Sequence, residues 1–320
     1  MSHYDVFNGD ADGICALQQL RLAEPREAIL VTGPKRDIAL LERVPGRAGD
    51  SVTVLDVSLD RNRGALLRLL ADGVSVAYFD HHFAGVVPQH PALASHIDTA
   101  PGVCTSMLVD RELGGRHRPW AIVAAFGDNL DRSARALART CGLGPGELAT
   151  LRDLGRAINY NGYGDSEADL PIAPAALWRA LRPFADPLDF ARHATALALV
   201  AARAQDMALA RAIPPLARSA AGRILALPDA AWARRVQGEF ANELATAEPG
   251  QAHAVLCALA DGYRVSVRAP VARPTGADEL CRRFPTGGGR AAAAGIDRLP
   301  REGLAVFLAA FDRAFAPAPR

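Results

Sequence analysis

The chain has 320 residues, half of them hydrophobic and 22% charged, and its formal net charge is +1. This length suits two average domains, and the composition predicts packed globular cores rather than a disordered chain. The near-neutral charge excludes a protein that coats long duplex nucleic acid by charge alone, although a local basic groove remains compatible with it.

The cysteines and the N-terminal residues indicate in which cellular compartment the protein is expected. The five cysteines are widely spread and form no CxxC pair, which predicts reduced thiols in a cytoplasmic protein and no zinc knuckle. The opening residues MSHYDVFNGDADG place acidic side chains where a signal peptide requires an apolar run. The longest Ala/Leu-rich stretch, Ala194–Ala202, is too short to span a bilayer, so no membrane association is expected.

The first third of the chain alternates short β-prone runs with helical patterns. Strands are expected at Tyr4–Phe7, Ala28–Val31, Ser51–Leu55 and Val74–Phe79. Helices are expected through Ile14, Leu17 and Leu20, and through Leu66, Leu67 and Leu70. Because the strands are mostly apolar and alternate with helices, the pattern predicts an α/β domain with a mostly parallel sheet.

The rest of the chain predicts a helical connector and a smaller α+β domain. Residues 105–212 read as successive helices, and Ala252–Ala260 and Gly262–Arg268 read as two strands joined by a hairpin turn. A helix is expected over Ala277–Arg283, and the segment Gly287-Gly288-Gly289-Arg290 is expected to open an alanine-rich helix. The expected domains are residues 1–135, an α/β domain, residues 136–220, the connector, and residues 221–320, the α+β domain.

Polar side chains follow three of the expected strands at their carboxyl ends. They are Asp10 and Asp12 after the first strand, Asp56 after the third, and Asp80, His81 and His82 after the fourth. Ligands of open parallel sheets bind at this edge, so we expect these residues to meet in one crevice. Asp128, which follows the apolar run Ala121–Phe126, adds a further carboxylate.

These residue types suit divalent cations. Carboxylates are hard ligands for Mg²⁺ or Mn²⁺, and imidazole is a borderline one. Two ions about 3.5–4 Å apart would need roughly four carboxylates and a histidine, with one carboxylate bridging them, and would activate water for attack on a phosphoryl group. Each acidic residue could instead have only a structural role, as a helix cap or as part of a solvated loop. The paired histidines could instead lie in a polar surface turn.

The glycine-rich segment near the C-terminus offers a candidate phosphate site. Gly287, Gly288 and Gly289 permit close approach of the backbone to an anion, and the amides of the helix expected after them would favour phosphate. Arg268 and Arg290 can clamp phosphate oxygens in a bidentate manner. The alternative is a flexible loop before a structural helix.

Taken together, these residues resemble the DHH phosphoesterase superfamily with a C-terminal DHHA1 domain. Four segments of the first domain match the family's first to fourth motifs in the expected order: Asp10-Ala11-Asp12-Gly13, Asp56, Asp80-His81-His82 and Gly127-Asp128. Two segments match the second domain, whose family form is GGGHxxAAG: Val265-Ser266-Val267-Arg268 and the run from Gly287 to Gly295.

The resemblance implies a Mn²⁺-dependent phosphodiesterase or exonuclease, with Mg²⁺ as the alternative metal and two ions expected. Asp10 would bind one ion, Asp12, His81 and Asp128 the other, and Asp56 would bridge them. His82 would contact the substrate phosphate or help the leaving group, and Asp80 would orient a histidine. The substrate would be presented by Arg268, Gly287, Gly288, Gly289 and Arg290.

Two positions depart from the family pattern. The histidine that many members carry four residues before the first motif aspartate is Val6 here, so the ion at Asp10 would lack an imidazole and its occupancy is open. Asn8 is the nearby polar substitute, and it is also expected to contact the substrate. The histidine of GGGH is Arg290, which keeps a phosphate donor but cannot act as an acid–base group near neutral pH.

The expected substrates are short oligonucleotides, cyclic or linear dinucleotides, or single-stranded nucleic acid. The modest length favours small substrates, because it leaves no room for the additional nucleic-acid-binding domains of RecJ-type enzymes. One alternative is a nucleotide-binding regulatory or sensor protein with a degenerate DHH site, and another is an α/β protein whose acidic turns are only caps. A homodimer is an open alternative to a monomer.

Overall fold

The computed structural model describes residues 1–316 and divides them into two compact units. The first unit is Met1–Ala202, and the second begins at Arg203, within the long helix α9 (Ala194–Ala212). The domain boundaries expected after residues 135 and 220 stay predictions. None of the helices within residues 1–316 combines the length and the apolar character that a membrane span requires.

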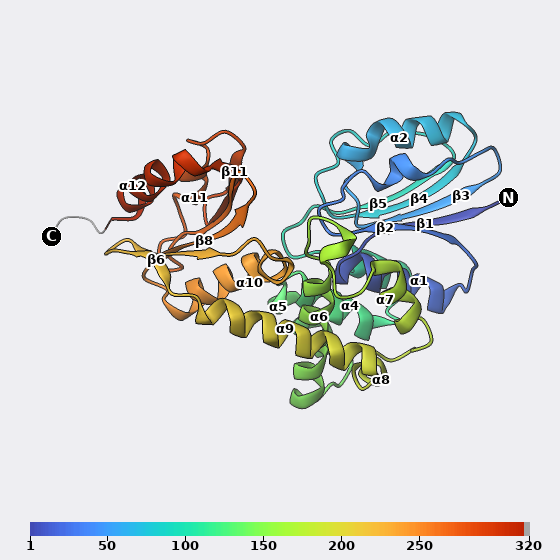
Figure 1. Cartoon of the computed structure of the whole chain (residues 1–320). Coiled ribbons are helices and arrows are strands. Elements are labelled where there is room, and N and C mark those ends of the chain that lie inside the picture. Colours follow the sequence, from blue (N-terminus) through green and yellow to red (C-terminus); the bar gives the residue numbers. More distant parts are fainter. Residues whose placement is uncertain (317–320) are drawn as a thin grey trace. The chain divides into compact units, whose positions relative to one another are not determined.

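The first unit contains a five-stranded parallel sheet, as the sequence predicted (Figure 1). Its strand order is β2-β1-β3-β4-β5, and every neighbouring pair is parallel. The strands are β1 (His3–Asn8), β2 (Ile29–Gly33), β3 (Ser51–Leu55), β4 (Ser75–Asp80) and β5 (Leu93–Ile97). The sequence pattern missed β5, because its residues LASHI are half-exposed at the sheet edge and lack the apolar run of the inner strands.

Helices cover both faces of this sheet, and alternate residues of each strand divide between the two faces. On one face, Val6, Val54 and Tyr78 pack in a cluster with helix α2 (Leu59–Ala71). On the other face, their neighbours Phe7, Leu55 and Phe79 join a second cluster that includes helix α1 (Ala11–Ala23). Figure 1 shows α2 and α1 on opposite sides of the sheet. The period of two along each strand therefore fixes which side chains point to which helical layer.

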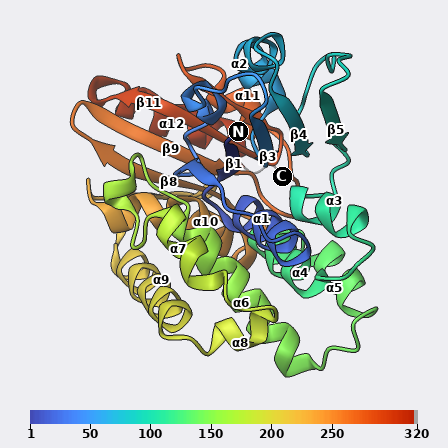
Figure 2. The same cartoon turned by 90° about the vertical axis from the view of Figure 1, so that its right-hand side faces the viewer.

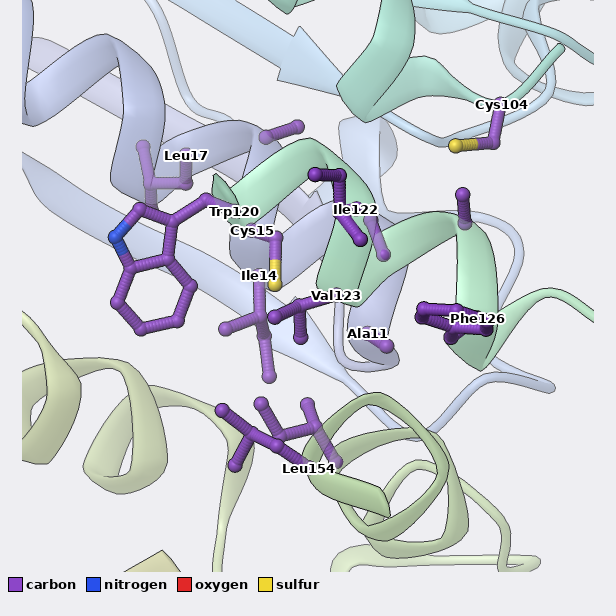
Figure 3. Close-up of a cluster of buried hydrophobic side chains, with 14 of the residues drawn as sticks. Ala11, Ile14, Cys15, Leu17, Cys104, Trp120, Ile122, Val123, Phe126 and Leu154 are labelled. Atoms are coloured by element: carbon purple, nitrogen blue, oxygen red, sulfur yellow. The ribbon is translucent and has the colours of Figure 1, made fainter. Parts of the chain in front are cut away.

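The second cluster is the largest core of the unit, and Trp120 lies inside it (Figure 3). Its indole is fully buried, and Nε1 donates to the carbonyl of Ala185 at 3.0 Å. Figure 2 shows α1, α4 and α6 gathered together beside the sheet. The helices after the sheet are α3 (Thr105–Glu112), α4 (Arg118–Gly127), α5 (Asp131–Ala138), α6 (Pro145–Asn161), α7 (Pro174–Leu181) and α8 (Pro187–Ala191). Short 3-10 turns lie at Leu40–Arg43 and Glu167–Asp169.

The second unit is built on a six-stranded mixed sheet of order β10-β11-β9-β8-β7-β6. The β7–β8 pair is parallel and the other pairs are antiparallel. Helices α11 and α12 pack in a core cluster with the sheet, and Figure 1 shows α10 on its other side. The elements are β6 (Pro215–Arg218), β7 (Gly222–Leu227), α10 (Ala231–Ala247), β8 (Ala252–Leu259), β9 (Gly262–Arg268), α11 (Ala277–Cys281), β10 (Gly287–Arg290), β11 (Ala293–Pro300), a 3-10 turn (Arg301–Gly303) and α12 (Leu304–Phe315).

The prediction of an alanine-rich helix after the triple glycine is wrong. Gly287–Arg290 and Ala293–Pro300 are instead the antiparallel strands β10 and β11. Strand β11 pairs with β9 and places Ala294 and Ile296 in the core cluster of the unit. Pairing with β9 and burial therefore outweigh the helical preference of alanine, which is at most about 1 kcal/mol per residue.

Candidate metal centre

The strands β1, β3 and β4 end at one edge of the parallel sheet. Asp12, Asp56 and His81 follow these strands, and Asp128 lies at the end of helix α4. The Nε2 atom of His81 lies 3.4 Å from Oδ1 of Asp56, 3.7 Å from Oδ2 of Asp128 and 3.9 Å from Oδ2 of Asp12. The structure thus brings together four residues that are far apart in the sequence. Two overlapping groups of side chains can hold a metal ion: Asp12, His81 and Asp128, and Asp56, His81 and His82.

Asp12 is held by the first backbone amides of helix α3. Its Oδ2 atom accepts a hydrogen bond from the N–H of Thr105 at 2.6 Å, and its Oδ1 atom accepts one from the N–H of Ser106 at 2.7 Å. The cap residue of α3, Cys104, makes no side-chain capping bond, so the carboxylate of Asp12 supplies the cap from another element. The partial positive charge of this helix end keeps the carboxylate in one orientation.

Asp56 has a left-handed backbone conformation, with φ at +59°. This conformation is unfavourable for a residue other than glycine, and such strained residues concentrate at functional sites. It turns the chain directly after β3, and the hydroxyl of Thr105 donates to Oδ1 of Asp56 at 3.2 Å. The fold therefore sustains a costly backbone turn at a carboxylate that faces His81.

His81 presents a lone pair to the carboxylates. Its Nδ1 atom lies 2.9 Å from the carbonyl oxygen of Val103, which can only accept a hydrogen bond, so Nδ1 carries the proton. In the neutral ring Nε2 is then the acceptor nitrogen, and it faces carboxylate oxygens that are also acceptors. A cation placed among these atoms would satisfy all of them, which is the donor arrangement of a metal-binding histidine.

The pKa values of the buried carboxylates favour a bound cation at this site. Burial, together with the carboxylates of Asp10, Asp12 and Asp128, raises the pKa of Asp56 well above its usual range. Burial and the charge of Asp128 also raise the pKa of Asp12. Hard oxygen donors with one imidazole nitrogen fit Mn²⁺ or Mg²⁺, and a divalent ion would offset this repulsion between the carboxylates.

Asp80 orients His82. The Oδ1 atom of the fully buried Asp80 lies 2.7 Å from Nδ1 of His82, and its Oδ2 atom accepts from the N–H of Leu59 at 3.4 Å. Burial lowers the pKa of His82, but the hydrogen bond and charge of Asp80 outweigh it and raise this pKa above its usual value. With Nδ1 held by Asp80, Nε2 of His82 remains to contact a phosphate. This geometry suits the role that the resemblance implied for Asp80, a role that stays a prediction.

Lys35, which the sequence analysis did not assign to the site, lies among the carboxylates. Its Nζ atom is 2.5 Å from Oδ2 of Asp10 and 3.3 Å from Oδ1 of Asp128. Burial lowers the pKa of Lys35, but the negative charges of Asp10 and Asp128 raise it well above the usual value. The ammonium is therefore charged across the physiological pH range.

Both carboxylate oxygens of Asp10 already have partners: Oδ2 meets this ammonium, and Oδ1 meets the first amides of helix α1. Its Oδ1 atom caps α1 by accepting from the N–H groups of Asp12 and Gly13, at 3.0 and 3.1 Å. Its own N–H donates to the side-chain oxygen of Asn8 at 3.3 Å. Burial raises the pKa of Asp10, but Lys35 outweighs burial and lowers it. Asp10 belongs to neither of the two groups that can hold an ion, and its expected role as a metal ligand stays a prediction.

A cavity of about 180 Å³ opens at this edge of the sheet. It is smaller than typical small-molecule pockets, which hold about 300–1,000 Å³, so it can enclose a phosphate group but not a whole nucleotide. Its lining includes Asn8, Lys35, Asp56, His81, His82 and Asp128.

A larger cavity of about 660 Å³ lies where the strands begin, at the opposite edge of the sheet. Two of its arginines are paired, Arg21 with Asp5 and Arg26 with Glu24. Parallel sheets bind ligands at their carboxyl ends, so the smaller cavity is the functional candidate.

The candidate substrate residues of the second unit have structural partners. Arg268 donates from Nε to Oδ1 of Asn242 at 2.5 Å and from Nη1 to the hydroxyl of Ser266 at 2.9 Å. A Cβ atom on Gly287 would lie 1.8 Å from the carbonyl oxygen of Cys281, and one on Gly289 would lie 2.5 Å from Cα of Ala294. The hairpin therefore requires glycine at both positions. Gly288 has open space around it, and Arg290 is exposed. The substrate-binding role of these residues stays a prediction.

Solved structures of known proteins share this fold, whereas no protein-family model and no curated protein matches the sequence. An exonuclease RecJ bound to manganese matches 99% of this chain and 91% of its own, with a TM-score of 0.62 and 20% identity. The DHH domain of a member of the S1p family of ribosomal proteins matches 98% of this chain and 86% of its own, with a TM-score of 0.60 and 14% identity. The chain has the DHH fold. A pGpG-specific phosphodiesterase from Vibrio cholerae shares it over 99% of this chain and 100% of its own, with a TM-score of 0.55 and 15% identity.

Within the DHH fold, the sequence pattern identified Asp12, Asp56, His81 and Asp128, which the structure brings together, but not the contacts that support them. Lys35 could have been found, because it is the only lysine in the chain and follows the expected second strand. Thr105, Ser106 and Val103 act mainly through backbone groups, which leave no signal in the residue types. These contacts appear only when α3 is packed against the sheet edge.

Proposed function

We propose that the chain is a metal-dependent phosphoesterase that hydrolyses phosphodiester bonds in short oligonucleotides or dinucleotides. The observation that carries this proposal is the position of the His81 Nε2 atom, which lies within 3.9 Å of oxygens of Asp12, Asp56 and Asp128. Three acidic side chains and one acceptor nitrogen converge on a point at the ligand-binding edge of a parallel sheet. A divalent ion bound there would stabilise the negative charge that develops on the phosphoryl oxygens.

Side chains of the protein would bind the metal ion, donate a proton and contact the substrate. Asp12, Asp56, His81 and Asp128 would hold the ion, and the amides of α3 would keep Asp12 in place. His82 would donate from Nε2 to the phosphate or the leaving oxygen, with its ring positioned by Asp80. We propose Mn²⁺ as the preferred metal, with Mg²⁺ as the alternative. Arg268 and Gly287–Arg290 are the proposed substrate contacts of the second unit.

Three observations favour short substrates. The cavity of about 180 Å³ encloses little more than the reacting phosphate, so specificity must come from few contacts. The formal net charge of +1 gives no overall excess of positive charge to attract a long polyanion. The pGpG-specific phosphodiesterase, which is matched over its whole length, also acts on a dinucleotide. Cytoplasmic location and a homodimer stay predictions.

The proposal is tested by product analysis with metal-stripped protein to which Mn²⁺ or Mg²⁺ is returned. The substrates are a linear dinucleotide, a short RNA, a short single-stranded DNA, a cyclic dinucleotide and a 3′,5′-bisphosphorylated nucleotide. We expect metal-dependent hydrolysis of at least one of them, and a loss of at least about 100-fold in Asp12→Asn, since even outer-shell changes at metal sites cost 10–100-fold. The exposed Asp72 provides the matched control, and Asp72→Asn should retain wild-type turnover.

The engagement of Asp10 by Lys35 favours a second candidate, a nucleotide-binding regulatory protein without turnover. The same panel separates the two. A nucleotide that raises the melting temperature without being hydrolysed under any metal condition would support the regulatory protein. Full activity in Asp12→Asn would contradict the proposed site.

A further inference from the structure

We propose that the ammonium of Lys35 permanently takes the place of a second divalent ion, so that the site binds one metal ion per chain. This inference rests on the proposed function, because it concerns the same site. In this proposal the centre contains two positive groups: the ammonium of Lys35, and the metal ion that His81 and its neighbouring carboxylates would hold.

The contacts of Lys35 are those expected of a bound cation. Its Nζ atom touches Asp10 at 2.5 Å and Asp128 at 3.3 Å, and it lies 5.6 Å from the centre of the Tyr163 ring. The side chain of Lys35 is only 29% exposed, and that of Asp10 is 1% exposed. Charges held this far from water interact more strongly than a surface ion pair.

Asp128 lies between the two cation positions. Its Oδ1 atom faces the ammonium at 3.3 Å, and its Oδ2 atom faces Nε2 of His81 at 3.7 Å. One carboxylate is thus shared between Lys35 and the group that can hold an ion. A shared carboxylate is the usual feature of a two-metal site, and here one of the two charges is already supplied by the protein.

Four residues before Asp10, strand β1 supplies no imidazole for a metal ion. Val6 on the same strand is fully buried in an apolar cluster, where it lies in register with Val31 and Val54. Oδ1 of Asp10 is used as the cap of α1, and the side-chain oxygen of Asn8 accepts from the N–H of Asp10. Oδ2 of Asp10, which these bonds do not use, meets the ammonium.

The composition of the chain points to the same residue. The sequence contains 36 Lys and Arg residues, and Lys35 is the only lysine among them. A guanidinium is a planar fork, whereas an ammonium is a compact point charge with three donors. The one position that carries lysine is therefore the one where a small cation must fit between carboxylates.

The backbone holds Lys35 in place. The N–H of Lys35 donates to the carbonyl of Gly162 at 2.8 Å, at the end of α6. A Cβ atom on Gly162 would lie 2.9 Å from Cα of Asp10, so this turn packs directly against the acidic loop. The ammonium is thus positioned in advance, and it can donate to a phosphoryl oxygen without rearrangement.

The test counts metal ions in the full-length chain. Metal-stripped protein is titrated with MnCl₂ by calorimetry, and the bound manganese is measured by elemental analysis after dialysis. We expect one ion per chain in the wild type and a second, weaker binding event in Lys35→Met, because that variant frees Asp10 for a metal. Arg36→Met removes a cation from the next, exposed position and should bind one ion, as the wild type does.

Each outcome decides the matter. Two ions in the wild type, or one ion with unchanged affinity in Lys35→Met, would overturn the role of Lys35 while leaving the phosphoesterase proposal intact. No manganese binding in the wild type would overturn both. If circular dichroism shows that Lys35→Met does not fold, the wild-type count alone decides, with one ion in support and two against. A folded Lys35→Met should also lose turnover at low Mn²⁺ and regain part of it as Mn²⁺ is raised.

Discussion

The Nδ1 atom of His81 lies 2.9 Å from the carbonyl oxygen of Val103, and this single contact determines which ring nitrogen faces the carboxylates. A backbone carbonyl cannot rotate away or change its protonation, so it holds the ring in one tautomer. Metal-binding histidines are commonly fixed in this way by a partner on the other nitrogen. The loop before α3 therefore contributes to the metal centre without supplying a ligand.

Replacement of His81 should abolish metal binding at the proposed centre. His81→Ala removes the one atom common to both groups that can hold an ion. We expect the Mn²⁺ dissociation constant to rise by at least about 100-fold, with a parallel loss of turnover, because outer-shell changes alone cost 10–100-fold. The check is Mn²⁺ titration, with the exposed His90→Ala as the control. Unchanged Mn²⁺ affinity in His81→Ala would rule out this centre.

Asp80→Asn should weaken catalysis while leaving the number of bound metal ions unchanged. The carboxylate of Asp80 touches His82 at 2.7 Å, and it belongs to neither group that can hold an ion. An amide in its place loses the negative charge that raises the pKa of His82 and holds its ring, and we expect a fall in kcat/KM of roughly 10–100-fold. Steady-state kinetics beside elemental analysis would show the difference. A variant that loses the bound metal instead would make Asp80 part of the metal centre.

Two glycines of helix α6 should respond oppositely to the same substitution. A Cβ atom on Gly155 would lie 2.1 Å from the carbonyl oxygen of Val123 in α4, whereas one on Gly146 meets nothing within 4 Å. We expect Gly155→Ala to lower the free energy of unfolding by about 1–3 kcal/mol through overpacking. Gly146→Ala should leave it unchanged or raise it by up to about 1 kcal/mol. Chemical denaturation measures both, and equal stability of the two variants would contradict the close packing of α4 on α6.

The buried ion pair between Asp5 and Arg21 should make stability depend on acid pH. Burial raises the pKa of Asp5, but hydrogen bonds and charges from His3 and Arg21 outweigh it and lower this pKa below the ordinary 3.8. A group with a depressed pKa in the folded state contributes stability above its unfolded pKa, and this contribution is lost as the pH falls through the folded pKa.

Asp5→Asn should therefore destabilise the protein most near neutral pH, by about 3–5 kcal/mol, because Arg21 is left without its buried partner. The difference from the wild type should shrink as the pH falls below about 4. Urea denaturation at several pH values provides the measurement, with the exposed Asp153→Asn as the control. A difference that is constant with pH would show that the pair contributes through packing rather than charge.

The residue pattern alone was enough to predict the parallel sheet and the polar residues that lie at the carboxyl ends of its strands. Strands β1, β3 and β4 bury side chains on both faces, so each of them is recognisable in the sequence as an apolar run. Their carboxyl ends must share an edge once the strands are parallel, which brings Asp12, Asp56 and His81 together. The half-exposed β5 carries no comparable run, and it could be located only through its pairing with β4.

Tertiary structure decided the rest, because the deciding forces act between segments distant in the sequence. The alanine-rich segment after Gly289 is helical by local preference, yet pairing with β9 makes it a strand. Asp10 and Asp12 belong to one short motif, yet Asp12 meets the amides of α3 while Asp10 meets Lys35. Residue types and spacing determined which groups reach the sheet edge. Only the packing of α3, α4 and α6 around that edge determined which carboxylate faces an imidazole and which is neutralised by an ammonium.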